Sequence, residues 1–186
     1  MAINRQVWVS KMAENIKHFK LQQLEDAKFI ATSLATYEQE GIKKSWEIVK
    51  AHDSVAILIY HRQKESFILV KQFRPAVYLN NENGMTVELC AGIVDKELTL
   101  AQIAQEEIEE ECGYAVPLET LERITSFHTS VGFAGSKQTL YFVEVDESMK
   151  VSEGGGVDHE QIEVVYLPVD QAKVMIYDEN IAKTPD

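Results

Sequence analysis

The stretch GIVDKELTLAQIAQEEIEEECGY, residues 92–114, combines a helical apolar period with a dense run of acids, since five of the six residues at 106–111 are glutamates. At about 100° per residue, one face of the helix is formed by Leu100, Ile103 and Ala104. Three glutamates continue that face: Glu107, Glu110 and Glu111. Because a helix buries its apolar stripe, the pattern predicts three carboxylates turned inward near the end of this helix.

The residues around this run predict a helix over 99–112. Thr99 can cap its start, with Gln102 three residues later as the capping-box partner. Gly113 is the expected stop just past the end. The acids lie near the negative end of the helix dipole, where they cost stability. A local conflict of this kind indicates function rather than folding.

Three converging carboxylates repel one another and raise one another's pKa. A hard divalent cation such as Mg²⁺ relieves that repulsion, so the inward acids predict a metal site. The alternative is a solvated acidic face, which is what most charge runs form. That alternative explains Glu106 and Glu109, which point away from the apolar stripe, but not three acids in line with it.

The same stretch resembles the Nudix box, G-x5-E-x7-R-E-U-x-E-E-x-G-U with U apolar. The residues in register are Gly92, Glu107, Ile108, Glu110, Glu111, Gly113 and Tyr114. Two places depart from the pattern, because Leu98 replaces its first glutamate and Glu106 its arginine. The resemblance implies Mg²⁺ held by the three inward glutamates, with Mn²⁺ as an alternative. The acid at 106 predicts a slow enzyme that Glu106→Arg would accelerate.

Four further stretches resemble the animal UDP-glucose diphosphatase branch of Nudix hydrolases: KSWEIVKAHDSV (44–55), LVKQFRPAVY (69–78), TVELCAG (86–92) and GGGVDHEQIEVVYLP (154–168). The resemblance implies hydrolysis of the pyrophosphate bond of nucleoside diphosphate sugars, UDP-glucose giving UMP and glucose 1-phosphate. An ADP-ribose diphosphatase is the alternative. A weakened module that binds nucleotide sugar is a third interpretation, motivated by Leu98 and Glu106.

Several residues outside the helix are candidates for the same site. Arg74, beside Pro75, suits recognition of a phosphate oxygen, although a surface ion pair is an equal alternative. The resemblance assigns a substrate role to Glu88 and a metal-binding backbone carbonyl to Ala91. It also makes Glu160, after three glycines, the candidate base for the attacking water, beside Glu107 and Glu111. Asp158 is the neighbouring alternative.

The chain is expected to divide into a β appendage at 1–51 and a Nudix domain at 52–186, an α/β fold of the α/β/α sandwich type with a mixed sheet. Two strands are predicted at 27–37 and 43–51, a loop at 79–85 and a last helix at 169–177. Since an isolated hairpin is marginal in water, the appendage predicts a homodimer. Trp46 on this hairpin is a core residue or, by the resemblance, a shelf for a nucleobase.

Composition excludes several other classes of protein. The formal net charge of −12 argues against nucleic-acid binding, which needs a basic face. The two cysteines, Cys90 and Cys112, have neither disulfide-scaffold nor zinc spacing and are expected to be reduced and buried. The sequence contains no apolar run of signal-peptide or membrane-spanning type. A cytoplasmic protein without a membrane partner is therefore expected.

Overall fold

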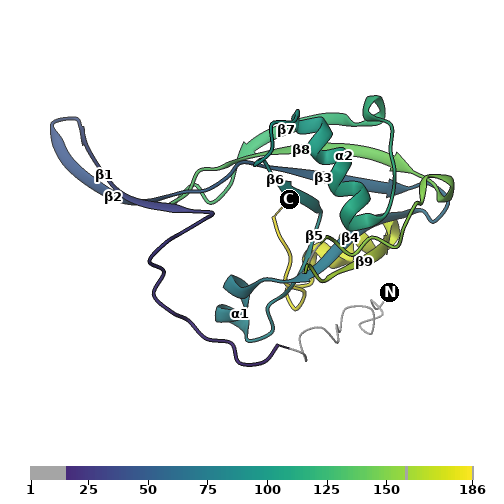
Figure 1. Ribbon diagram of the computed structural model, residues 1–186, viewed down its shortest axis with the longest axis horizontal. Helices are drawn as coiled ribbons and strands as arrows, with labels where there is room; N and C mark the ends of the chain where they lie inside the picture. The colour runs from purple at the N-terminus through teal and green to yellow at the C-terminus, as the bar shows by residue number, and fades with distance from the viewer. Residues whose placement is uncertain (1–15, 158, 186) are drawn as a thin grey trace.

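A computed structural model describes residues 16–157 and 159–185 of the chain. Asp158 and residues 1–15 lie outside the described part. Figure 1 shows a twisted sheet with helices on its faces and a hairpin projecting from it. The elements in chain order are β1 (Ala31–Gln39), β2 (Ile42–Lys50), β3 (Ser54–His61), β4 (Ser66–Phe73), α1 (Pro75–Asn81), β5 (Met85–Glu88), β6 (Cys90–Ile93), α2 (Leu100–Glu107), β7 (Glu122–His128), β8 (Lys137–Val145), β9 (Ile162–Pro168) and α3 (Val169–Tyr177).

The main sheet is mixed and is built around β3 and β4. β3 runs parallel to β8 and antiparallel to β4 and β6, whereas β4 also pairs antiparallel with β5 and β9. β3 and β4 pair only next to their connecting turn, where His61 faces Ser66. Farther along, β6 takes the place of β4 beside β3. The short strands β5 and β6 therefore bring residues 85–93 into the middle of the sheet.

Helices cover both faces of this sheet. On one face Ile103 and Ala104 of α2 pack into a cluster that includes Ile57 and Val70. On the other face Met175 of α3 packs with a second apolar cluster. The expected α/β/α sandwich is thus confirmed. α3 occupies the predicted range 169–177.

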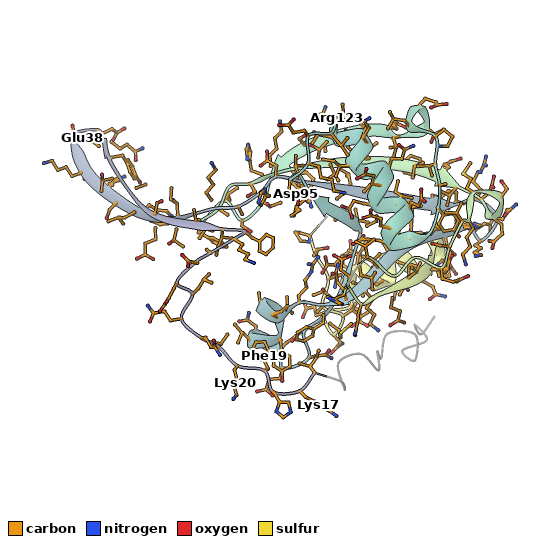
Figure 2. The ribbon with its side chains drawn as sticks, in the orientation of Figure 1. Lys17, Phe19, Lys20, Glu38, Asp95 and Arg123 are labelled. Atoms are coloured by element: carbon orange, nitrogen blue, oxygen red, sulfur yellow. The ribbon has the colours of Figure 1, made fainter. Side chains whose placement is uncertain are left out.

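The appendage is a two-stranded antiparallel hairpin outside the sandwich (Figures 1 and 2). Its tight turn is made by Glu40 and Gly41, both with positive φ, as hairpins of the type I′ class require. The two strands are exposed along nearly their whole length. Their contacts with the sandwich include a hydrogen bond from the Val49 amide to the Phe133 carbonyl at 2.8 Å.

The structure corrects several predicted boundaries. A helix, α1, occupies 75–81, so the loop predicted at 79–85 is shorter, and Pro75 provides the favoured first helical residue. Seven residues are too few to reveal a helical period. Residues 85–93 form two short strands, β5 and β6, because the chain changes partner from β4 to β3 between Glu88 and Cys90. None of the helices in the described part is long and apolar enough to cross a bilayer.

Candidate active site

The acid-rich helix begins and stops at the predicted residues, but its last turn is π-helical rather than α-helical. Thr99 and Gln102 form the reciprocal capping box, and Gly113 ends the helix with φ of 78°. Between them, α2 stops at Glu107 and one π-helical turn follows over Ile108–Cys112. π turns inside helices occur frequently at functional sites. The wheel with 100° per residue therefore holds only as far as Glu107.

The glutamates of this run still separate into an inner and an outer set. Glu111 is buried and Glu109 is exposed, whereas Glu106, Glu107 and Glu110 are half-buried. Glu106 forms an ion pair with Lys96, with Nζ and Oε2 2.7 Å apart. The face of the helix that carries Glu107, Glu110 and Glu111 is therefore acidic, although a buried helix face is usually apolar.

Strand β6 packs directly under the inner glutamates. The Ala91 amide donates a hydrogen bond to Oε2 of Glu111 at 3.1 Å. Since the amide and the carbonyl of one strand residue point to the same side, the Ala91 carbonyl also faces this helix. Gly92 has no Cβ atom, and one placed there would overlap with the carboxylate of Glu107. The glycine therefore allows Glu107 to lie against the strand.

The pKa values of two inner carboxyls, Glu107 and Glu111, are raised toward neutrality. Burial, and then the charge of Glu110, raise the pKa of Glu107 to about 7. Burial raises the pKa of Glu111 to about 8, even though the Ala91 amide opposes the shift. The charge of Glu160 also raises the pKa of both groups. Carboxyls this costly to ionise are typical of functional sites.

Arg74 and Glu88 form a second, ionic part of the site. The Nε and Nη2 atoms of Arg74 donate to the two carboxylate oxygens of Glu88 at 2.8 and 2.6 Å. The hydroxyl of Thr86 also donates to Glu88. The hydrogen bond with Glu88 raises the pKa of Arg74, and the charges of Glu111 and Glu160 add to that shift. The guanidinium is thus held in one orientation beside the acids.

The glycine loop after β8 is attached to the end of the acidic helix. The Gly155 amide donates to the Glu111 carbonyl at 2.9 Å and the Gly156 amide to the Glu110 carbonyl at 3.0 Å. A Cβ atom at Gly154 would overlap with the Glu111 carbonyl. The glycines of this loop are therefore bound to the backbone of the acidic helix. Glu160 follows them, exposed, and accepts a hydrogen bond from the Val157 amide at 3.1 Å.

The structure gathers most of the predicted residues in one place but not all of them. Trp46 lies on the hairpin, 57% exposed, and donates from Nε1 to the Gly132 carbonyl at 2.7 Å. It lines a hollow formed by the hairpin and the β7–β8 loop. Asp158, the alternative loop acid, lies outside the described residues. Cys90 and Cys112 are free and buried, as expected.

The oxygen donors of this site fit a hard divalent cation. Three carboxylates, two with raised pKa values, lie beside a strand carbonyl, and no sulfur or imidazole ligand competes in the set proposed. Within residues 16–157 and 159–185, however, no three His, Cys, Asp or Glu side chains are already arranged as a complete ligand set. Binding would therefore require the glutamate side chains to rotate toward a common point.

The family profile described as "NUDIX domain" matches residues 50–184, and the chain therefore belongs to the Nudix family of hydrolases. Nudix hydrolases generally use a divalent metal. The chain is similar to "Uridine diphosphate glucose pyrophosphatase NUDT14" of Bos taurus, with 40% identity and 80% of each chain covered. The mouse protein of the same name is 37% identical, again with 80% of each chain covered. "GDP-mannose pyrophosphatase" of Cronobacter sakazakii is 33% identical, covering 87% of this chain and 85% of its own length.

Sequence reasoning missed two features of this site. Lys96 matches no place of the box pattern, whose first acid would stand two residues later, at Leu98. The π turn at Ile108–Cys112 has no signal in the residue pattern. Its geometry depends on contacts with β6 and the glycine loop, which are distant in sequence.

Proposed function

We propose that this protein hydrolyses the pyrophosphate bond of nucleoside diphosphate sugars in the presence of Mg²⁺. The observation that carries the proposal is a pair of neighbouring acids, Glu107 and Glu111, with raised pKa values. The charge of Glu111 acts on Arg74, which Glu88 holds in place. A diphosphate needs both kinds of group, because its charge must be neutralised and its orientation held. The names of the related proteins support the same class of substrate.

In this proposal Glu107, Glu110, Glu111 and the Ala91 carbonyl would hold the metal, with Mn²⁺ as an alternative to Mg²⁺. The ion would neutralise phosphate charge and lower the pKa of a bound water. Arg74 binds the diphosphate through those donors of its planar guanidinium that Glu88 does not occupy. Glu88 acts through Arg74 by fixing its orientation.

An acid near the attacking water is proposed to remove a proton from that water. Glu160 or one of the helix glutamates, Glu107 or Glu111, takes the proton. A pKa near neutrality suits a general base, and the pKa of Glu107 is about 7. Glu160 would have to release its contact with the Val157 amide to reach the substrate. With UDP-glucose, the products would be UMP and glucose 1-phosphate.

The identity of the sugar nucleotide separates the candidate functions. UDP-glucose is proposed as the preferred substrate because 40% identity to the bovine UDP-glucose enzyme exceeds the 33% identity to a bacterial GDP-mannose enzyme. Turnover of UDP-glucose, GDP-mannose and ADP-ribose, each with Mg²⁺ and with product identification, tests this. Preference for ADP-ribose would contradict the sugar assignment. If the protein bound these compounds but hydrolysed none of the three, it would instead be a nucleotide-sugar binding module.

We also propose that the protein is a homodimer that uses residues 1–51 as its association element. The β1–β2 register places four exposed apolar residues on one face of the hairpin: Tyr37, Ile42, Trp46 and Ile48. The opposite face carries mainly Thr, Ser, Lys and Glu. A second chain covering the apolar face would account for this division and would bring Trp46 toward a partner's substrate. Two buried, free cysteines support the cytoplasm as the compartment.

A further inference from the structure

Lys96 forms an ion pair with an acid at the place where the Nudix pattern has arginine. Its Nζ lies 2.7 Å from Oε2 of Glu106, and the two side chains are 47% and 41% exposed. Lys96 belongs to the loop 94–99 between β6 and α2, which Figure 2 marks by the label on Asp95. The pattern has an acid in this loop and arginine on the helix. This chain has Leu98 in place of that acid, and Lys96, two residues earlier in the loop, forms an ion pair with Glu106 on the helix.

Lys96 also interacts electrostatically with two proposed metal ligands, Glu107 and Glu110. After Glu106, the charges of Glu110 and Glu107 raise its pKa, and in return Lys96 lowers the pKa of Glu107. A lysine ammonium is a compact charge on a flexible stem. Without Glu106, its nearest available partners would therefore be the carboxylates that the metal needs.

We propose that Glu106 is a positioning residue that holds the Lys96 ammonium on the outer side of the helix, so that Lys96 offsets the repulsion among the glutamates without occupying Glu107 or Glu110. This inference rests on the proposed metal role of those two residues. Glu88 has the corresponding task for Arg74 on the other flank of the site. Both flanking cations are thus held by acids outside the proposed ligand set.

The pairing reverses the effect expected of Glu106→Arg. An arginine at 106 would face Lys96, and the repulsion between them would push one cation toward the ligand carboxylates. Turnover is therefore expected to fall in this variant rather than rise. The acid at 106 is then a part of the site and not a defect in it.

Calorimetric titration of the full chain with Mg²⁺ alone, without substrate, tests the proposal. Glu106→Gln frees Lys96 to compete for ligand oxygens and should weaken Mg²⁺ binding about fivefold, the size expected of one partly exposed ion pair. Adding Lys96→Met removes the competitor, so the double variant should bind Mg²⁺ within about twofold of Lys96→Met alone. Glu106→Asp, which keeps the acid, should stay within about twofold of the wild type.

The matched control is Glu109→Gln, which removes the same charge from the same helix end but has an exposed position. Equal Mg²⁺ affinities for Glu106→Gln and Glu109→Gln would overturn the inference, as would a double variant as weak as Glu106→Gln. If the wild type hydrolyses nucleotide sugar and only these comparisons fail, the proposed function survives. A wild type that neither binds Mg²⁺ nor turns over substrate overturns both.

Discussion

The side chain of Glu107 lies against the backbone of Gly92, in the space that a Cβ atom at residue 92 would fill. The two residues come from α2 and from β6, which packs beneath it. The glycine of the box pattern is therefore needed here for close approach. Its φ does not lie in the left-handed range, so backbone freedom is not the reason.

Gly92→Ala should displace the Glu107 carboxylate and lower kcat by about a hundredfold, because a shift of about 1 Å in a catalytic group can cost that much. The thermal midpoint should change little. Steady-state kinetics and calorimetric melting measure the two effects. Gly132→Ala is the control, since a Cβ there would meet nothing within 4 Å. Unchanged kinetics for Gly92→Ala would contradict the assigned role of Glu107.

Glu107→Gln and Glu111→Gln should each reduce turnover of the preferred nucleotide sugar by about a hundredfold or more, because each removes a metal ligand or a proton acceptor. Glu109→Gln, on the exposed side, should be nearly silent. Initial rates at saturating Mg²⁺ test all three variants. Near-wild-type rates in both inner variants would remove the basis for placing the chemistry at this helix.

Arg74→Lys should raise KM for the nucleotide sugar about tenfold with a smaller change in kcat. A lysine cannot reproduce the planar fork that binds Glu88 and a phosphate together, and a tenfold change corresponds to about 1.4 kcal/mol. Arg62→Lys is the matched control, because Arg62 forms an ion pair with Asp146, 84 residues away in sequence, in an exposed position. Equal KM values for the wild type and Arg74→Lys would exclude Arg74 from substrate binding.

The metal-free protein should lose stability as the pH rises from about 4.5 to about 8. The folded-state pKa values of Glu107 and Glu111, about 7 and about 8, are raised from 4.5. In this interval the unfolded chain binds fewer protons than the folded chain, so the free energy of unfolding falls. Melting in EDTA from pH 5 to 8.5 should show the decline.

The double variant Glu107→Gln/Glu111→Gln isolates the part of this decline due to the two carboxyls. Its thermal midpoint should depend less on pH than that of the wild type, whereas Glu109→Gln should follow the wild type. Mg²⁺ should stabilise the wild type more at pH 8 than at pH 6, because its ligands must lose their protons. A difference between wild type and double variant that stays constant with pH would show that these pKa values are not raised.

Light scattering should give a mass of about twice 21.1 kDa at micromolar concentration. Ile42→Glu, on the apolar face of the hairpin, should shift the protein toward the monomer. Leu34→Glu is a demanding control, because Leu34 is 64% exposed but lies on the opposite face of the same hairpin. Equal effects of the two substitutions would contradict the proposed interface, and a wild-type mass near 21.1 kDa would contradict the dimer.

Much of the site could be predicted from local patterns because its residues lie close together in the chain. Thr99, Gln102 and Gly113 marked both ends of the acidic helix through capping chemistry that acts within a few residues. The inward position of Glu107 followed from the period of the apolar residues before it, whereas Glu110 and Glu111 lie in the π turn, where that period no longer holds. Pro75 alone did not reveal α1, since seven residues carry too little periodic information.

Pairings across the sheet depended on the tertiary structure. Arg74 and Glu88 were both candidates from the sequence, yet their shared orientation follows from the pairing of β4 with β5. Lys96 and Glu106 are ten residues apart, on a loop and a helix, and their contact depends on how α2 lies over β6. The burial that raises the pKa values of Glu107 and Glu111 has the same origin. Burial is produced by segments distant in sequence, whereas helix caps and apolar periods are properties of a single segment.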